Sequence, residues 1–198
     1  MDYAGLKAAV ETSTGPRTDI PDHIYEITLS EINRDVRIKE MLTATTVAIS
    51  DPSSPTALAA DFLEAEEVYH IDGQINRFYA PITKPSQTEL RQEFERTYSI
   101  TDDGITLTGA PNEAFTLQFL YYAANGALSG DTDVNPVLTK HPDLYLSLAI
   151  CNAAKWKRNL EEAAVRRSEY EAALRRVNIS NRRSRNPGVI KPRHRRVA

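Results

Sequence analysis

The stretch AFTLQFLYYAANGALSGDTDVNPVLTKHPDLYLSLAICNAAKWKRN, residues 114–159, decides the fold class, because the spacing of its apolar residues changes from strand-like to helical. Its opening, AFTLQFLYYAA, is long and aromatic, which predicts a strand that is buried on at least one face. After an acidic turn, Pro142 and the aspartate that follows it indicate the start of a helix. Leu144, Leu148 and Cys151 then form an apolar stripe along that helix. The chain therefore passes from sheet to helix within this stretch.

Upstream of this stretch, residues 41–122 are predicted to be rich in β-structure. The run MLTATTVAI at their start contains many β-branched residues and predicts a strand. Asp72-Gly73 predicts a turn between VYHI and INRFYAPI, and Asp103-Gly104 predicts a hairpin within YSITDDGITLTG. Between these two turns, KPSQTELRQEFER predicts one short helix over residues 84–96, because it opens with a capping box.

Two helices are predicted before the β-rich region. Residues 2–12 are expected to form a short helix that ends at a Gly-Pro turn signal. A second helix begins at Thr18 or Asp19, holds Pro21 in its first turn and continues to Arg37. Its apolar face is predicted to contain Ile20, Ile24, Ile27, Ile32 and Val36.

A strongly helical run, LEEAAVRRSEYEAALRRVN, follows the helix that begins at Pro142. We expect this run to end near Val177, because Pro187 and Pro192 exclude a regular helix in the segment beyond it. The helices from both ends of the sequence are expected to share one core, whose members include Ile24, Ile27, Leu144, Leu148 and Trp156.

The predicted fold is α+β: a helical bundle built from N- and C-terminal helices, with an inserted β-rich subdomain and an extended C-terminal arm. We assign residues 1–39 to the N-terminal helices of the bundle, 40–124 to the inserted β-rich subdomain, 125–179 to the C-terminal helices of the bundle and 180–198 to the basic extended arm. The chain is expected to cross between bundle and insert twice, near Lys39–Met41 and near Ala123–Ser129.

The sequence offers little support for catalysis. The four histidines, His23, His70, His141 and His194, lack the spacing of metal ligands, and the single cysteine lies on an apolar stripe. Neither a glycine-rich phosphate loop nor a G-x-S-x-G elbow is present. Paired aspartates such as Asp102-Asp103 lie in predicted turns, where Asp hydrogen-bonds its own backbone. We therefore predict no catalytic residue, no cofactor and no metal, and a protein that is not an enzyme.

A membrane partner is not expected, because no apolar run approaches the roughly 18–20 residues of a membrane-spanning helix. Charge, in contrast, is distributed unevenly along the chain. Residues 175–198 carry nine Lys or Arg residues and no acid, which leaves residues 1–174 with 15 bases and 27 acids, a net charge of −12. Such asymmetry is typical of a tail that binds another molecule, although a solvated terminus is the simpler alternative.

A longer stretch, Leu117–Asn178, resembles the head-to-tail adaptor (connector) proteins of tailed bacteriophages. In that family a strand ending in a Tyr-Tyr-Ala pattern leads through an acidic turn to a segment with Pro-Asp-Leu-Tyr-Leu, which is followed by two Ala- and Arg-rich helices. The matching residues are Tyr121, Tyr122, Ala123, Leu128, Ser129, Asn135, Leu138, Pro142, Asp143, Leu144, Tyr145, Tyr170, Ala172 and Leu174. The upstream LAADFLEAEEVYHIDG also resembles the family's pattern, with Ala59-Ala60 in place of the usual Leu-Pro.

The resemblance implies a structural role in the virion, at the head-tail junction, for a protein made in the cytoplasm of the bacterial host. Adaptors of this kind assemble as a ring, commonly of twelve copies, beneath the portal protein of a DNA-filled capsid. The ring extends the channel for double-stranded DNA and docks the neck or tail completion protein. A body with a net charge of −12 suits a channel through which DNA slides without binding.

The resemblance also implies that the C-terminal segment is a portal-docking arm. Its assigned contact residues are Arg182, Arg183, Arg185, Val189, Ile190, Lys191, Arg193, Arg195 and Arg196. The apolar pair can seat in a groove or add a strand to a sheet edge, and the arginines can pair with carboxylates or phosphates. Asp103 and Gly104, at the predicted hairpin tip, are candidate contacts with a neighbouring subunit or with the tail-side partner.

The alternative function is that of a DNA-binding accessory protein acting through its basic tail, since Lys and Arg bind phosphate by releasing counterions. The tail lacks the interleaved aromatic residues of a single-strand binder, and no helix-turn-helix or zinc-finger pattern accompanies it. An enzyme with an unrecognised site is a third hypothesis. Ring formation on addition of a portal would favour the adaptor, whereas salt-dependent DNA binding by the isolated protein would favour the accessory protein.

Overall fold

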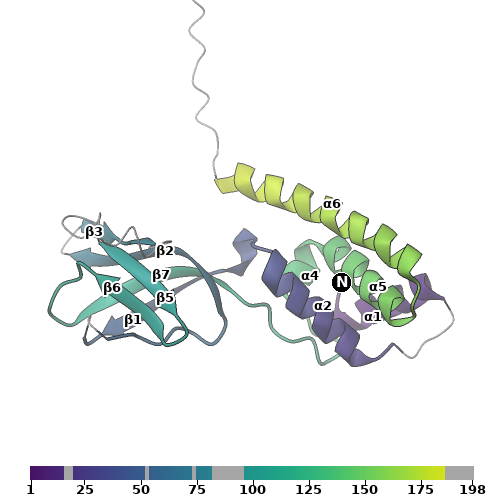
Figure 1. The fold of residues 1–198 in the computed structure, drawn as a ribbon, viewed down its shortest axis with the longest axis horizontal. Helices are drawn as coiled ribbons and strands as arrows, with labels where there is room; N and C mark the ends of the chain where they lie inside the picture. The colour runs from purple at the N-terminus through teal and green to yellow at the C-terminus, as the bar shows by residue number, and fades with distance from the viewer. Residues whose placement is uncertain (16–19, 52–53, 73–74, 82–95, 186–198) are drawn as a thin grey trace, which may run out of the picture. The chain divides into compact units, whose positions relative to one another are not determined.

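The computed structural model describes residues 1–15, 20–51, 54–72, 75–81 and 96–185. The chain divides into two compact units, which we call the helical unit (residues 1–40 and 125–198) and the β unit (residues 41–124). Figure 1 shows helices in the first and strands in the second, so the predicted α+β class is confirmed. The helix predicted over residues 84–96 falls almost entirely outside the described residues.

The helical unit contains long helices from both ends of the chain. Its elements are α1 (Tyr3–Thr14), α2 (Asp22–Asp35), α4 (Pro136–Lys140), α5 (Pro142–Trp156) and α6 (Leu160–Arg185), and the 3-10 turn η1 (Lys39–Met41) follows α2. Short polar side chains cap α1, α4 and α6, where Asn159 accepts a hydrogen bond from the N–H of Glu162 at 3.2 Å. Asp2 accepts a hydrogen bond from the backbone N–H of Gly5 at 2.9 Å, and Asn135 accepts one from the N–H of Leu138 at 2.8 Å.

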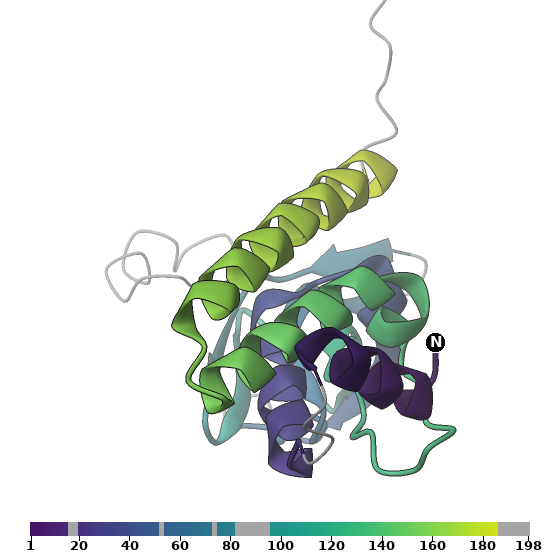
Figure 2. The same cartoon turned by 90° about the vertical axis from the view of Figure 1, so that its right-hand side faces the viewer.

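Helix α5 is the centre of the helical unit, since α1, α2 and α6 all pack against it. Figure 2 shows α1 and α6 on different sides of α5. The predicted stripe of Leu144, Leu148 and Cys151 is buried, and so is almost every residue from Leu144 to Ala154. A helix that is apolar nearly all round is typical of a core position. Burial also raises the pKa of Tyr145 to about 12, although its hydroxyl accepts a hydrogen bond from Asn135 at 2.8 Å.

Two residues assigned to the shared core lie at the surface. Ile27 is 46 % exposed and Trp156 is 37 % exposed, so their placement in the core was wrong, whereas Ile24, Leu144 and Leu148 are buried. The buried face of α2 holds Thr28 rather than Ile27. Thr28 is accommodated there because its hydroxyl donates to the carbonyl of Ile24 at 2.8 Å, which leaves no unpaired hydroxyl proton in the core.

Several helix boundaries also differ from those predicted. Pro21 has an extended conformation and precedes α2, which begins at Asp22, so it does not lie in the first turn. Helix α6 continues to Arg185 instead of ending near Val177, because the first helix-breaking residue comes only at Pro187. The extended conformation expected from residue 180 is therefore wrong up to Arg185. The short helix α4 was missed, although Asn135-Pro136 is an N-terminal helix signal.

The β unit contains two sheets. Its strands are β1 (Leu42–Ile49), β2 (Phe62–Asp72), β3 (Ile75–Phe78), β4 (Ala80–Pro81), β5 (Thr97–Thr101), β6 (Gly104–Thr108) and β7 (Phe115–Ala123). One sheet has the order β1-β7-β2-β3 and the other has the order β4-β5-β6. Both contribute to one apolar core, for example through Val68 and Phe119 from the first sheet and Ile105 and Leu107 from the second. The unit is therefore a small sandwich.

The Asp103-Gly104 turn is confirmed between the antiparallel strands β5 and β6. Strands β2 and β3 are also antiparallel neighbours, but Gly73 of the other turn signal lies outside the described residues. Within the sandwich core His70 is buried, and its Nδ1 lies 2.9 Å from the hydroxyl oxygen of Tyr79. Burial lowers the pKa of His70 below its usual value, a direction reinforced by the charge of Arg96. A neutral histidine bonded to a tyrosine is a satisfied core residue, which explains its presence in an otherwise apolar interior.

Candidate interaction site

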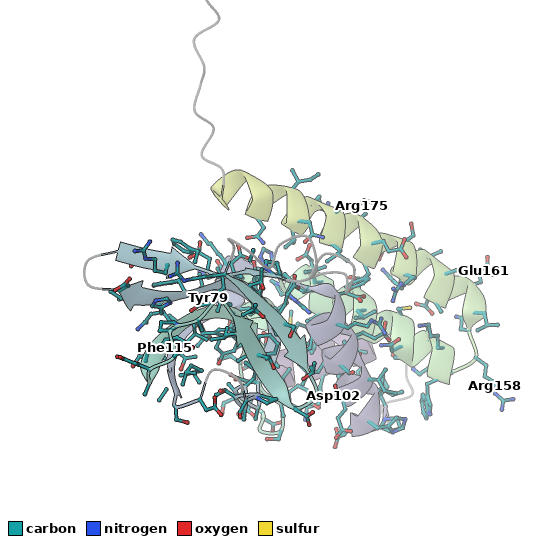
Figure 3. The ribbon with its side chains drawn as sticks, turned by 60° about the vertical axis from the view of Figure 1, so that its left-hand side comes forward. Tyr79, Asp102, Phe115, Arg158, Glu161 and Arg175 are labelled. Atoms are coloured by element: carbon teal, nitrogen blue, oxygen red, sulfur yellow. The ribbon has the colours of Figure 1, made fainter. Side chains whose placement is uncertain are left out.

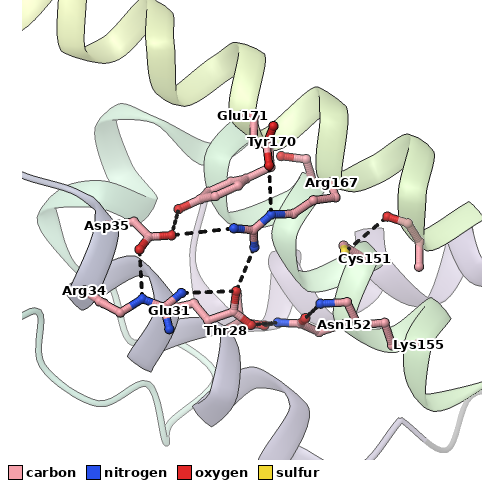
Figure 4. Close-up of polar contacts among 12 residues, drawn as sticks. Thr28, Glu31, Arg34, Asp35, Cys151, Asn152, Lys155, Arg167, Tyr170 and Glu171 are labelled. Carbon is pink, nitrogen blue, oxygen red and sulfur yellow. Dashed lines mark hydrogen bonds and ion pairs between the residues drawn. The ribbon is translucent and has the colours of Figure 1, made fainter. Parts of the chain in front are cut away.

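Helix α6 is the element that carries the basic end of the chain, and its inner face is fixed by polar contacts to α2. Arg167 donates from Nη1 to Glu31 at 2.9 Å and from Nε to Glu171 at 3.3 Å. The hydroxyl of the buried Tyr170 donates to Asp35 at 3.2 Å. Figure 4 shows these side chains meeting between α2 and α6. The network sets the position of α6 through charge as well as apolar packing.

The Arg167 network extends to the central helix. The side-chain amide of Asn152 donates both to Thr28 and to Glu31, each at 3.2 Å, and Lys155 donates to Asn152 at 3.3 Å. Burial alone would lower the pKa of Arg167, but its bonds to Glu31 and Glu171 raise that pKa above its ordinary value. The guanidinium therefore stays charged, and α2, α5 and α6 are cross-linked by one set of charge-assisted hydrogen bonds.

Replacing Arg167 with methionine should destabilise the helical unit by about 1–3 kcal/mol. The Glu31 and Asp35 side chains are only 16 % and 20 % exposed. The substitution removes the cation that lies 2.9 Å from Glu31 and leaves Asp35 paired with Arg34. Urea denaturation followed by far-ultraviolet circular dichroism measures the change. Arg175→Met is the matched control, because Arg175 is exposed on the same helix and its loss should cost under about 0.5 kcal/mol. Equal stability of the two variants would show that the network contributes nothing.

The basic end of α6 projects from the fixed part of the helix. Arg175 is exposed, and Figure 3 shows it and Glu161 projecting from α6. Arg176 lies 3.7 Å from Asp143, in an ion pair exposed enough to contribute little stability. The backbone of three predicted arm residues, Arg182, Arg183 and Arg185, belongs to the end of this helix. Positive charge at a helix C-terminus is favourable, because the helix dipole is negative there.

The remaining predicted arm residues, Val189, Ile190, Lys191, Arg193, Arg195 and Arg196, lie outside the described residues. The structure thus places part of the predicted arm on a helix that α2 holds in position. The carboxamide of Asn181 donates to the carbonyl of Arg37. This hydrogen bond is the last described side-chain contact of α6 before Arg182, where the predicted arm residues begin. Because it is helical, the backbone from Arg182 to Arg185 has a defined direction within the helical unit.

The hairpin tip between β5 and β6 is a second candidate contact surface. Asp102 and Asp103 are exposed, and Figure 3 shows Asp102 at the end of the hairpin. Together with Ile100, Phe62 and residues 57–59, the tip lines a hollow of about 470 Å³. This surface combines negative charge with an apolar floor. Sequence reasoning identified Asp103 but missed Ile100 and the hollow, because residues 57–59 come from a distant part of the sequence.

Gly104 is not a surface contact. It is buried, its φ is +128°, and a Cβ built on it would lie 2.1 Å from the carbonyl oxygen of Thr56. Thr56 and Ile105 exchange two backbone hydrogen bonds of 2.9 Å at this point. The glycine is therefore required by the close approach of two backbone segments, and its assignment to an exposed contact was wrong.

Among the residues that the structure describes, no group of three or more His, Cys, Asp and Glu side chains could hold a metal ion. Within the same ranges, none of the helices has the length and apolarity needed to cross a membrane. Burial raises the pKa of the Cys151 thiol, whose Sγ lies 3.3 Å from the carbonyl oxygen of Ala163, so the thiol is protonated and packed inside.

The whole of this architecture, from α1 through the β unit to the basic end, falls within one family model. The model described as SU10 adaptor protein matches residues 1–193. The chain belongs to the SU10 adaptor protein family. The predicted resemblance to a phage head-to-tail adaptor is confirmed by this match, which extends well beyond Leu117–Asn178. The comparison with curated proteins gave no match.

Membership in the SU10 adaptor family identifies the chain as a structural component of a phage virion that interacts with other virion proteins. Such a family favours a non-catalytic role. The polar network around Arg167 and the two charged surfaces are then understood as parts of an assembly component. The network cross-links α2, α5 and α6 within the helical unit.

Proposed function

We propose that this SU10 adaptor is a head-to-tail adaptor that forms a ring, with twelve copies expected, beneath the portal protein of a tailed phage. The ring extends the channel for double-stranded DNA and docks the neck or tail completion protein. The observation that carries the proposal is the family match over residues 1–193, which includes the hairpin tip and all of the assigned contact residues of the basic end except Arg195 and Arg196. In this proposal the helical unit is the bundle, the β unit is its insert, and the protein resides at the head-tail junction.

The distribution of charge between the two units supports a component with two different binding ends. The β unit contains 12 acids and 4 bases, a net charge of −8, whereas the helical unit contains 15 acids and 20 bases, a net charge of +5. Opposite potentials on two parts of one chain favour different partners for each part. We assign the basic end, Arg182 to Arg196, to the portal and the acidic hairpin tip at Asp103 to a neighbouring subunit or the tail-side partner.

Two variants test the assignment of the basic end to the portal: one removes the C-terminal residues, and the other removes only positive charge. One variant ends at Arg185, so that α6 remains complete, and a second replaces Arg182, Arg183 and Arg185 with glutamine. Both should lose binding to portal-bearing capsids in a co-sedimentation assay, because arginine–carboxylate pairs are lost while the fold is kept. Lys140→Gln with Arg158→Gln is the control, since it also removes positive charge but from exposed positions outside the basic end. Unchanged capsid binding by both basic-end variants would mean that this end is not the portal anchor.

The alternative, a DNA-binding accessory protein, is favoured by one observation, the accumulation of cations after Arg175 without any acid. It makes a distinct prediction for the same two variants. Their affinity for duplex DNA should fall, and the dependence of that affinity on salt should become shallower, in proportion to the charges removed. Normal capsid binding together with this loss of DNA affinity would favour the alternative over the adaptor.

A further inference from the structure

Strand β1 leaves one edge of its sheet open. It pairs with β7 in an unbroken antiparallel register from Leu42 opposite Tyr122 to Ile49 opposite Phe115. It is the outermost strand of its sheet, and within the described ranges no backbone hydrogen bond from another segment reaches its outer edge. A regular strand edge of eight residues presents a row of unpaired N–H and C=O groups, which is a template for another strand.

The other described strand edges of the β unit carry protection that β1 lacks. The outer edge of β6 is bonded by Thr56, whose N–H and C=O both pair with Ile105 at 2.9 Å. Strand β4 has two residues and ends in Pro81, and β3 has four residues and carries Arg77. Short edges, proline and charge are the usual devices against unwanted pairing. Strand β1, with the sequence LTATTVAI, has none of them.

Strand β1 is neutral along its length, and the charged residues that flank it, such as Glu40 and Asp51, lie beyond its two ends. Neither β1 nor its neighbour β7 contains a charged residue. The nearest acidic strand is β2, with Glu64, Glu66 and Glu67, and it lies two strand spacings, about 10 Å, from β1. That distance exceeds the Debye length of about 8 Å at physiological ionic strength. A neutral strand can therefore approach this edge despite the net charge of −8 on the β unit.

We propose that the open edge is occupied by β1 of a second copy of this chain, which joins two β units into one continuous sheet. Strand β1 of a second copy matches the edge in length and is neutral, as the edge itself is. The basic C-terminal segment matches it less well, because Pro187 and Pro192 leave only four residues between them for strand pairing. The pairing goes beyond the proposed adaptor function and gives the free protein a protected edge before it meets virion partners.

The alternation of side chains limits the register of the pair, and within that limit we place the twofold axis at Thr46. Ala44, Thr46 and Ala48 are exposed on one face, whereas Val47 and Ile49 face the core. Directly opposite residues of antiparallel strands point to the same face of the sheet. The twofold axis must therefore lie midway between the two copies of one residue, and not between a residue and the copy of its sequence neighbour. An axis at Thr46 places Ala44 opposite Ala48 and keeps Val47 and Ile49 within the overlap. Two copies of Thr46 then lie next to each other.

The experiment uses the full chain in solution, without a portal, so that its outcome is independent of the adaptor function. Sedimentation velocity should show a concentration-dependent dimer. Thr46→Lys should weaken dimerisation about tenfold or more, because it places two like charges opposite each other on an edge that was neutral. Thr139→Lys is the matched control, because Thr139 is an exposed threonine of α4, and it should leave the dimer unchanged. Thermal denaturation checks that both variants remain folded.

Disulfide trapping tests the register. Under mild oxidation, Thr46→Cys should give a covalent dimer, because facing strand residues lie within disulfide range, whereas Ala44→Cys should not. The wild-type protein is the blank, since its Cys151 is buried. The proposal would be overturned if the protein were monomeric at every concentration, or if Thr46→Lys left the dimer affinity unchanged. It would also be overturned by a dimer that is lost only on removal of residues 186–198, which would make the C-terminal segment the occupant.

Discussion

Replacing Gly104 with alanine should unfold or severely loosen the β5–β6 side of the β unit, with an expected loss of about 2–6 kcal/mol. Two independent effects add at this position. The backbone has φ +128°, which L-residues with a side chain rarely adopt, and the new Cβ would lie 2.1 Å from the carbonyl oxygen of Thr56. The atoms that the new Cβ would meet belong to the backbone of Thr56 and Ala57, so rotation of a side chain cannot relieve the clash.

The measurement must report on the β unit, because the single tryptophan, Trp156, belongs to the helical unit. Hydrogen exchange of the amides of β5 and β6 is suitable, and protection there should fall sharply in the variant. Gly126→Ala is the control, because its Cβ would meet nothing within 4 Å and no positive φ is required there. Wild-type protection in Gly104→Ala would mean that the segment containing Thr56 moves away at little cost, and that the close approach is not structurally important.

The sequence predicted those elements whose signal is local. The β5–β6 hairpin followed from Asp103-Gly104, β7 from its aromatic content, and the start of α5 from Pro142, since each signal depends on residues adjacent in the chain. The reason why Gly104 is a glycine was not predictable in the same way. A turn explains a glycine at this position, but the approach of Thr56 depends on its pairing with Ile105, 49 positions away in the sequence.

Errors arose where tertiary contacts override the local pattern. On α2 the apolar Ile27 was preferred to the polar Thr28, yet Thr28 is buried because it bonds to Ile24 and accepts a bond from Asn152. Helix α6 was ended too early because Pro187 and Pro192 were assumed to exclude helix from the whole segment after Val177, although no helix breaker occurs before Pro187. Intrinsic propensity was the better guide to the end of α6, and tertiary contact was decisive on α2.

The candidate surfaces were predictable to different degrees. The accumulation of Arg and Lys at the C-terminal end is visible in the sequence without any structure. The helical base of that end was not predicted, nor was the Arg167 network that fixes it, because Glu31 and Arg167 are 136 residues apart in sequence. A basic segment that begins on a fixed helix has fewer conformations to lose on binding than one that begins in a free coil. This is favourable for an anchor.

Leu148→Ala should have the largest effect of any single truncation in the helical unit that we consider here, about 2–5 kcal/mol. Leu148 is fully buried on α5, the helix against which α1, α2 and α6 all pack. Removing the isopropyl end of its side chain leaves a cavity between helices that the Arg167 network also ties together, so the helices cannot close the gap freely. Because Trp156 lies at the end of the same helix, its fluorescence should follow this unfolding in urea.

Leu160→Ala is the matched control for this prediction, since Leu160 is the same residue type but 72 % exposed at the start of α6. Its truncation should change the free energy of unfolding by under about 0.5 kcal/mol. The β unit supplies an internal reference, because hydrogen exchange in β1 and β7 should remain close to wild type in both variants if the two units unfold separately. Loss of protection in β7 together with α5 would instead show that the two units unfold as one cooperative structure. Similar stability of Leu148→Ala and Leu160→Ala would contradict the central role of α5 in the helical core.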